Sequence, residues 1–165
     1  ELTQRILRAI ETGEDFRVYV TVPLHPEGPP AGATVQEILR WQFRTIEFMY
    51  RKIGRAIEKS GAVAVPQDYL RFFCLGKREC PDDVPSSSSS SSSLSLENAP
   101  KNSIARKVRD SLRFMIYVHS KFAVFDDEYV IVGSANINER SMAGNRDTEI
   151  AIGAYQPCFT DEAAD

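Results

Sequence analysis

Six residues between positions 119 and 136 carry the side chains that phosphate chemistry requires. They are His119, Lys121, Asp126, Gly133, Ser134 and Asn136. Residues two apart on a strand share a face, so an extended segment would point His119 and Lys121 into the same space. The spacing therefore predicts a compact group of an imidazole, an ammonium and neutral donors.

Such a group could transfer a phosphoryl group without a metal ion. An imidazole titrates near neutral pH, so His119 can attack phosphorus or pass a proton to a leaving oxygen. The Lys121 ammonium can hold phosphate oxygens and offset charge that develops in the transition state. Gly133 lets the backbone come close, while the Ser134 hydroxyl and the Asn136 amide add donors to the same oxygens.

Each of these residues also has a purely structural interpretation. A single His-x-Lys pair is common in proteins, and Asp126 alone is typical of a turn. Ser134 and Asn136 could merely cap a helix. The functional interpretation depends on all six occurring together, at fixed spacing, between apolar segments.

The apolar pattern predicts alternating helices and strands around these residues. Helical spacing covers residues 2–10 and ends at Gly13, and a second, long helix should run from a capping box at Thr34–Glu37 to Gly61. Trp41, Phe43 and Phe48 are expected to pack along this long helix. A short helix is expected over 104–112. Extended segments are predicted at 16–22, 69–75, 114–118, 121–125, 129–132 and 147–152, with a turn at 126–128.

Composition limits the classes of protein that are plausible. The 165 residues suit one domain or one lobe, and 42% hydrophobic residues can form a core. The net charge of -3 disfavours a nucleic-acid partner. No apolar run is long enough to span a membrane, and the first residues do not look like a signal peptide, so a cytoplasmic protein peripheral to membranes is expected. Residues 77–103 include eight consecutive serines and predict a disordered, flexible insertion.

The same residues resemble the second signature of the phospholipase D superfamily, which reads His-x-Lys, four residues, Asp, six residues, Gly-Ser-x-Asn. Likeness to plant-type phospholipases D continues in segments such as Val22–Gly28, Met115–His119 and Gly153–Pro157. The resemblance implies an α/β fold, one phospholipase D-like lobe with a mixed β-sheet flanked by helices. It makes residues 1–165 a partial catalytic domain, the second-signature half of a longer enzyme and a carboxy-terminal fragment of it.

The resemblance also implies roles for individual residues. His119 would protonate the leaving alcohol and then activate water, while Lys121, Ser134 and Asn136 would bind phosphate. Asp126 would pair with a histidine across the interface between two halves, and Glu149 would buttress the local imidazole. No metal or other cofactor enters the chemistry, although Ca²⁺ is expected for the full-length enzyme.

The departures from the family pattern shape the functional prediction. A first signature is missing, because the other histidine, His25, has no lysine two residues on. The expected activity is hydrolysis of phosphatidylcholine-type lipids at a membrane surface, with the missing amino-terminal half as partner and the chain inactive alone. The alternatives are a single-signature phosphodiesterase or nuclease acting as a homodimer, and a non-catalytic truncated remnant.

Overall fold

The computed structural model describes residues 1–24, 28–29, 31–78, 100 and 103–156. The five helices are α1 (Leu2–Thr12), α2 (Ala33–Ser60), α3 (Pro66–Tyr69), α4 (Ile104–Ser111) and α5 (Glu139–Met142). The seven strands are β1 (Val18–Thr21), β2 (Leu70–Phe73), β3 (Gly76–Arg78), β4 (Arg113–Met115), β5 (Lys121–Phe125), β6 (Tyr129–Gly133) and β7 (Ala151–Tyr155). These counts refer to the described residues.

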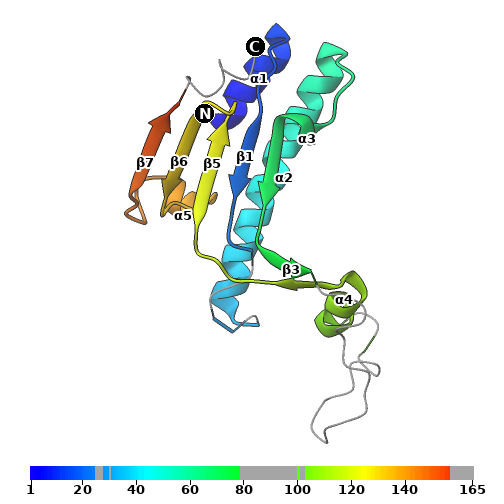
Figure 1. Ribbon diagram of the computed structural model, residues 1–165, viewed down its shortest axis with the longest axis vertical. Helices are drawn as coiled ribbons and strands as arrows, with labels where there is room; N and C mark the ends of the chain where they lie inside the picture. The colour runs from blue at the N-terminus through cyan, green and yellow to red at the C-terminus, as the bar shows by residue number, and fades with distance from the viewer. Residues whose placement is uncertain (25–27, 30, 79–99, 101–102, 157–165) are drawn as a thin grey trace, which may run out of the picture.

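Five of these strands form one mixed sheet in the order β2-β1-β5-β6-β7. β1 and β2 are parallel, as the α2 crossover between them requires, and the other neighbours are antiparallel. β3 and β4 form a separate ribbon that extends from one end of the sheet (Figure 1). The predicted α/β fold with a mixed sheet and helices is confirmed.

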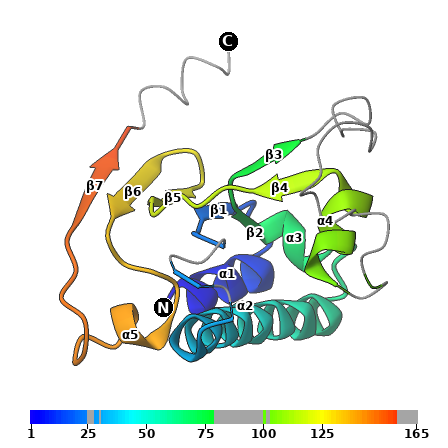
Figure 2. The same cartoon turned by 90° about the horizontal axis from the view of Figure 1, so that it is seen from below.

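The hydrophobic core lies between one face of the sheet and the two long helices. α1 and α2 lie side by side against that face (Figure 2). Alternate residues of β1, Val18 and Val20, are buried there because every second side chain of a strand points to the same side. Ile6 and Ile53 are fully buried beneath them, and Leu70 of β2 completes the layer.

Both long helices end where the sequence predicts. Gly13 and Gly61 adopt left-handed backbone conformations with φ of 72°, and each donates its backbone N–H to a carbonyl of the last helical turn. The predicted capping box at Thr34–Glu37 is wrong. α2 begins at Ala33 after Gly32, and no side chain caps it.

The expected packing of the α2 aromatic residues is also wrong. Trp41, Phe43 and Phe48 are 44%, 67% and 48% exposed. The core-facing side of α2 instead buries Met49 and Ile53, together with other residues at helical spacing. A 28-residue helix presents several apolar residues on each side, and only one side meets the sheet.

Several strands are shorter than predicted. β1 begins at Val18 rather than at position 16. Of the predicted 69–75 strand, only Leu70–Phe73 is extended, as β2, because Tyr69 ends α3 and residues 74–75 lie between β2 and β3. Residues 116–120 are not a strand, so His119 lies in the connection before β5. The last strand begins at Ala151, which leaves Glu149 just before it. The predicted insertion over 77–103 lies almost wholly outside the described residues, as does His25.

The second face of the sheet carries a row of apolar side chains that no described helix covers. The row follows the strand register from β2 to β7. It consists of the apolar Phe73, Phe122, Val132 and Ile152, with the hydroxyl-bearing Thr21 of β1 between the two phenylalanines. Of these, Val132 is 52% and Ile152 is 75% exposed. A contiguous apolar strip of this kind is typical of a surface that another layer of protein covers.

Candidate active site

The β5–β6 hairpin sets two of the predicted site residues opposite each other. The strands pair so that Lys121, the first residue of β5, faces Gly133, the last residue of β6. At the other end, Asp126 and Asp127 have φ of 54° and 56°, which is the pattern of a type I′ turn. The predicted turn at 126–128 is therefore confirmed, and it fixes the register of the hairpin.

Gly133 allows the next strand to approach unusually closely. A Cβ built on Gly133 would lie 2.6 Å from the Ile150 carbonyl oxygen and 2.7 Å from the Ala151 Cβ. Those distances are too short for any side chain, and one of the atoms involved is backbone. The absence of a side chain at Gly133 thus places the segment that carries Glu149 directly beside the end of β6.

Ser134 joins this neighbouring segment through four hydrogen bonds. Its hydroxyl donates to the Glu149 carboxylate and, more weakly, to the Ile150 carbonyl at 3.4 Å. The Ile150 N–H donates to the same hydroxyl at 3.0 Å, and the Ser134 N–H donates to the Ile150 carbonyl at 2.9 Å. Ser134 therefore holds Glu149 in one place rather than capping a helix.

Glu149 is the centre of a small electrostatic cluster. Its pKa is lowered from the ordinary 4.5, chiefly by the hydrogen bond from Ser134 and next by that from Ser141. The charges of Lys121 and His119 lower the Glu149 pKa further, while partial burial opposes them. A carboxylate that accepts donors and faces cations remains ionised, and it can orient an imidazole and favour its charged form.

His119 is exposed and stands at the edge of this cluster. Its ring stacks on Tyr117 with 5.9 Å between the ring centroids and 26° between the planes. Because His119 precedes β5 rather than lying on it, strand alternation does not place it beside Lys121. Both residues nevertheless lie close enough to Glu149 to lower its pKa, so they share one neighbourhood.

Lys121 and Asn136 place buried polar groups near the same end of the sheet. Lys121 is only 6% exposed, and its ammonium acts on Glu149 through charge. The Asn136 side-chain oxygen is buried without a hydrogen-bond partner among the described residues. A buried amide left unsatisfied in this way is suited to a ligand, since rotation of the amide presents its NH₂ donor instead.

Asp126 is the one predicted site residue that lies elsewhere. It is at the far end of β5, about 16 Å from Lys121 at the usual rise of a strand. Its N–H donates to the Arg17 carbonyl at 2.7 Å, and its carboxylate accepts the Arg17 N–H at 3.4 Å. Within this chain Asp126 holds the turn against β1, and its pairing with a histidine across an interface stays a prediction.

Two supporting contacts were not foreseen from the sequence. Ser141 of α5 is buried and donates to Glu149. The Arg140 Nη2 donates a hydrogen bond to Asp147 Oδ1 at 3.2 Å, and the Arg140 Nε lies 3.2 Å from Oδ2 as an ion pair without hydrogen-bond geometry. This ion pair ties α5 to the loop that carries Glu149. The sequence spacing of Ser141 and Glu149, or of Arg140 and Asp147, does not predict these contacts. They form only because the chain turns back between positions 142 and 147.

The described residues do not form a metal site. Among them, no three His, Cys, Asp or Glu side chains converge to hold an ion. The expectation of Ca²⁺ for the full-length enzyme stays a prediction, and no chemical step is assigned to the ion. In the same part of the chain, no helix combines the length and the apolar character needed to cross a bilayer.

Comparison with known proteins shows the family of the chain. The profile of the family described as Phospholipase D matches residues 1–165. The chain belongs to the phospholipase D family. It is similar to phospholipase D alpha 3 of Arabidopsis thaliana, with 53% identity over 157 residues, which are 95% of this chain and 18% of the relative.

Two further plant proteins show the same relationship. Phospholipase D beta 1 of Arabidopsis thaliana is 51% identical over 97% of this chain, and phospholipase D alpha 1 of Zea mays is 51% identical over 95%. The matched region is 14% and 18% of those relatives. The chain thus spans less than a fifth of the length of the curated relatives it matches, and the predicted likeness to plant phospholipases D is confirmed.

Proposed function

We propose that this chain provides one half of a phospholipase D active site, which hydrolyses the distal phosphodiester bond of phosphatidylcholine-type lipids. The observation that carries the proposal is the cluster in which Ser134, Lys121 and His119 all act on Glu149. An accessible imidazole and an ammonium that both act on one carboxylate support this proposal, because phosphoryl transfer needs a proton donor and a positive charge near the phosphate.

The proposed reaction has two steps and needs a second histidine from the other half. That histidine attacks phosphorus, and the bond to the choline oxygen breaks as the His119 imidazolium donates a proton to it. His119, now neutral, then takes a proton from water, and the resulting hydroxide attacks the phosphohistidine. Phosphatidic acid and the free nucleophilic histidine are the products, so His119 ends protonated as it began.

The neighbouring residues have separate tasks in this proposal. Lys121 and the Asn136 amide bind the non-bridging phosphate oxygens and offset their charge in the transition state. Ser134 joins them when its single hydroxyl proton turns from Glu149 to the phosphate. Glu149 orients His119 and stabilises its protonated form, which the first step needs. The Ser134 hydroxyl, already bound to Glu149, links the phosphate site to the acid.

The partner in this proposal is the amino-terminal half that carries the first signature. The size of the relatives supports a larger active unit, because the chain matches only 14–19% of their length. The unit acts on phospholipid at a membrane surface, from the cytoplasm and without nucleic acid. Ca²⁺ is a requirement of the longer protein rather than of the chemistry at His119.

A choline-release assay on phosphatidylcholine vesicles tests the proposal. The chain alone is expected to release no choline, whereas the chain joined to the first-signature half of a plant relative is expected to be active. The active form should also make phosphatidyl alcohols when a primary alcohol is added, because the phosphohistidine accepts either nucleophile. Chelation of Ca²⁺ is a separate arm of the assay.

Three outcomes would contradict the proposal. Turnover by the isolated chain that His119→Ala abolishes would show that the half site is sufficient. A mass of twice the monomer together with cleavage of bis-p-nitrophenyl phosphate would favour the homodimeric phosphodiesterase. A joined protein that folds, binds vesicles and remains inactive would favour the non-catalytic remnant.

A further inference from the structure

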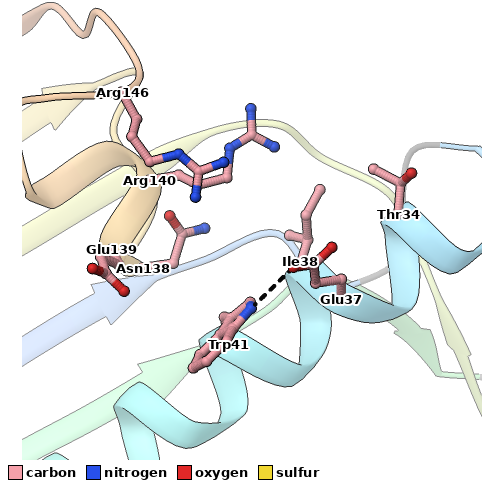
Figure 3. Close-up of a pocket in the computed structure, with 8 residues that line it drawn as sticks. All are labelled: Thr34, Glu37, Ile38, Trp41, Asn138, Glu139, Arg140 and Arg146. Carbon is pink, nitrogen blue, oxygen red and sulfur yellow. Dashed lines mark hydrogen bonds between the residues drawn. The ribbon is translucent and has the colours of Figure 1, made fainter.

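A pocket separate from the Glu149 cluster lies between the amino-terminal turns of α2 and the α5 segment. Its volume is about 290 Å³, and none of the residues of the Glu149 cluster lines it. Figure 3 shows Arg140, Arg146 and Asn138 on one side, with Glu37 and Trp41 on the other. The two walls come from segments about 100 residues apart, so the fold creates the pocket.

The α5 wall is positively charged. The Arg140 and Arg146 guanidinium groups converge above the Asn138 amide (Figure 3). Asp147 pairs with Arg140, but among the described residues no carboxylate pairs with Arg146. Asn138 is 5% exposed, and its oxygen accepts the Ser141 N–H, which leaves its NH₂ group turned to the pocket. A planar guanidinium beside an amide donor suits a phosphate or a carboxylate.

The α2 wall has the opposite character. The Trp41 Nε1 donates to the Glu37 carboxylate at 3.4 Å, which holds the carboxylate at the edge of the indole. The indole itself is 44% exposed. The Arg44 guanidinium already lies 5.7 Å from the centre of the Trp41 ring, so this ring accepts a cation. An aromatic face with an adjacent carboxylate is the usual setting for an alkylammonium group.

The opposed walls decide which kind of ligand fits. A simple anion bound at Arg146 would also meet the Glu37 charge, and a simple cation at Trp41 would meet the two arginines. Glu139 lines the pocket as well, but its carboxylate points away from the guanidinium groups (Figure 3). A small ligand with separated charges of both signs satisfies each wall.

We propose that this pocket binds a small zwitterion, whose phosphate or carboxylate lies against Arg146 and Asn138 and whose alkylammonium group lies against Trp41 and Glu37. The zwitterion is a free metabolite or the headgroup of a zwitterionic lipid, which share this chemistry. The proposal does not depend on catalysis at His119, because binding here uses other residues.

Trp41 supplies a direct test, because it is the only tryptophan in the sequence. Phosphocholine added to the chain is expected to change the Trp41 fluorescence in a saturable way. Inorganic phosphate alone and choline alone should bind at least tenfold more weakly. A parallel titration with phosphatidylcholine vesicles distinguishes the two sources, since a lipid site responds to vesicles at lower headgroup concentration than to free phosphocholine.

Two variants remove one charge from each wall. Glu37→Gln keeps an oxygen that can accept from the Trp41 indole, and Arg146→Gln keeps a donor. Each is expected to weaken phosphocholine binding about tenfold or more without changing the circular dichroism. Lys59→Gln, at the far end of the same helix, should bind as the unmodified chain does.

The proposal is overturned if phosphocholine gives no saturable response. It is equally overturned if phosphate or choline alone matches phosphocholine, or if Arg146→Gln and Glu37→Gln bind as tightly as Lys59→Gln. A response to vesicles that survives both charge removals would show that lipid contacts Trp41 without this pocket.

Discussion

The Ser134 hydroxyl donates a hydrogen bond to the Glu149 carboxylate across fifteen positions of sequence. Ser134 follows directly on β6 and Glu149 lies just before β7, so this bond connects the ends of two neighbouring strands. It also joins a residue expected to bind phosphate to a residue expected to control the imidazole. Chemistry at the two positions should therefore be coupled.

The first prediction concerns the pKa of Glu149. Ser134→Ala removes the largest cause of its lowered pKa, so the pKa should rise toward the ordinary 4.5. Because folding lowers this pKa, the stability that Glu149 contributes is present above its unfolded value and is lost as pH falls through the folded value. Carboxyl ¹³C NMR titration measures the change, and Ser60→Ala, on the distant end of α2, should leave Glu149 unaltered.

Gly133 provides a second prediction, with Gly54 as its matched control. Gly133→Ala should destabilise the chain by about 1–3 kcal/mol, because the new methyl group would collide with the backbone beside β7. Gly54→Ala should be stabilising by up to about 1 kcal/mol, since it lies inside α2 and its Cβ would meet Pro66 at an ordinary 3.7 Å. Urea unfolding of both variants measures the two changes in unfolding free energy. Equal effects would show that β7 does not approach Gly133 as described.

A third prediction separates chemistry from folding at His119. In the protein joined to its first-signature half, His119→Ala should lower kcat by about 10²–10⁴-fold, the usual contribution of a general acid. The side chain is exposed, so the melting temperature should stay within the error of the measurement. A variant that kept its activity, or one that lost activity only by unfolding, would remove His119 from the mechanism.

The fourth prediction compares two large apolar residues of α2. Ile53→Ala should cost about 2–5 kcal/mol of unfolding free energy, because Ile53 is completely buried. Phe43→Ala should change it by no more than about 0.5 kcal/mol, because Phe43 is 67% exposed. A large loss at Phe43 would mean that a second layer covers this side of the helix in solution.

Local signals in the sequence were enough for much of the fold. Gly13 and Gly61 ended the two long helices as predicted, since only glycine adopts the left-handed cap without strain. The predicted capping box was wrong because Gly32, rather than Thr34, is the N-cap residue of α2. Thr34 therefore lies inside the helix. The predicted packing of Trp41 was wrong for another reason. Helical spacing alone does not show which apolar side of α2 meets the sheet.

The site was predicted in part. Residue type and spacing predicted that Lys121 and Ser134 lie in one neighbourhood, and the family resemblance added Glu149. The structure brings the three residues together. The contacts of Ser141 with Glu149 and of Arg140 with Asp147 could not be predicted from the sequence. They depend on a loop that brings the chain back to α5. Such contacts follow from tertiary packing rather than from any local pattern.

The tight turn at Asp126 and Asp127 has a consequence at the opposite end of its hairpin. Side chains alternate along β5, so deletion of one residue within the turn would slide the pairing by a single position and move Lys121 to the other side of the sheet. Every chemical group would still be present, yet the ammonium would face away from its carboxylate. The length of this turn therefore determines the geometry of the proposed half site at the opposite end of the hairpin.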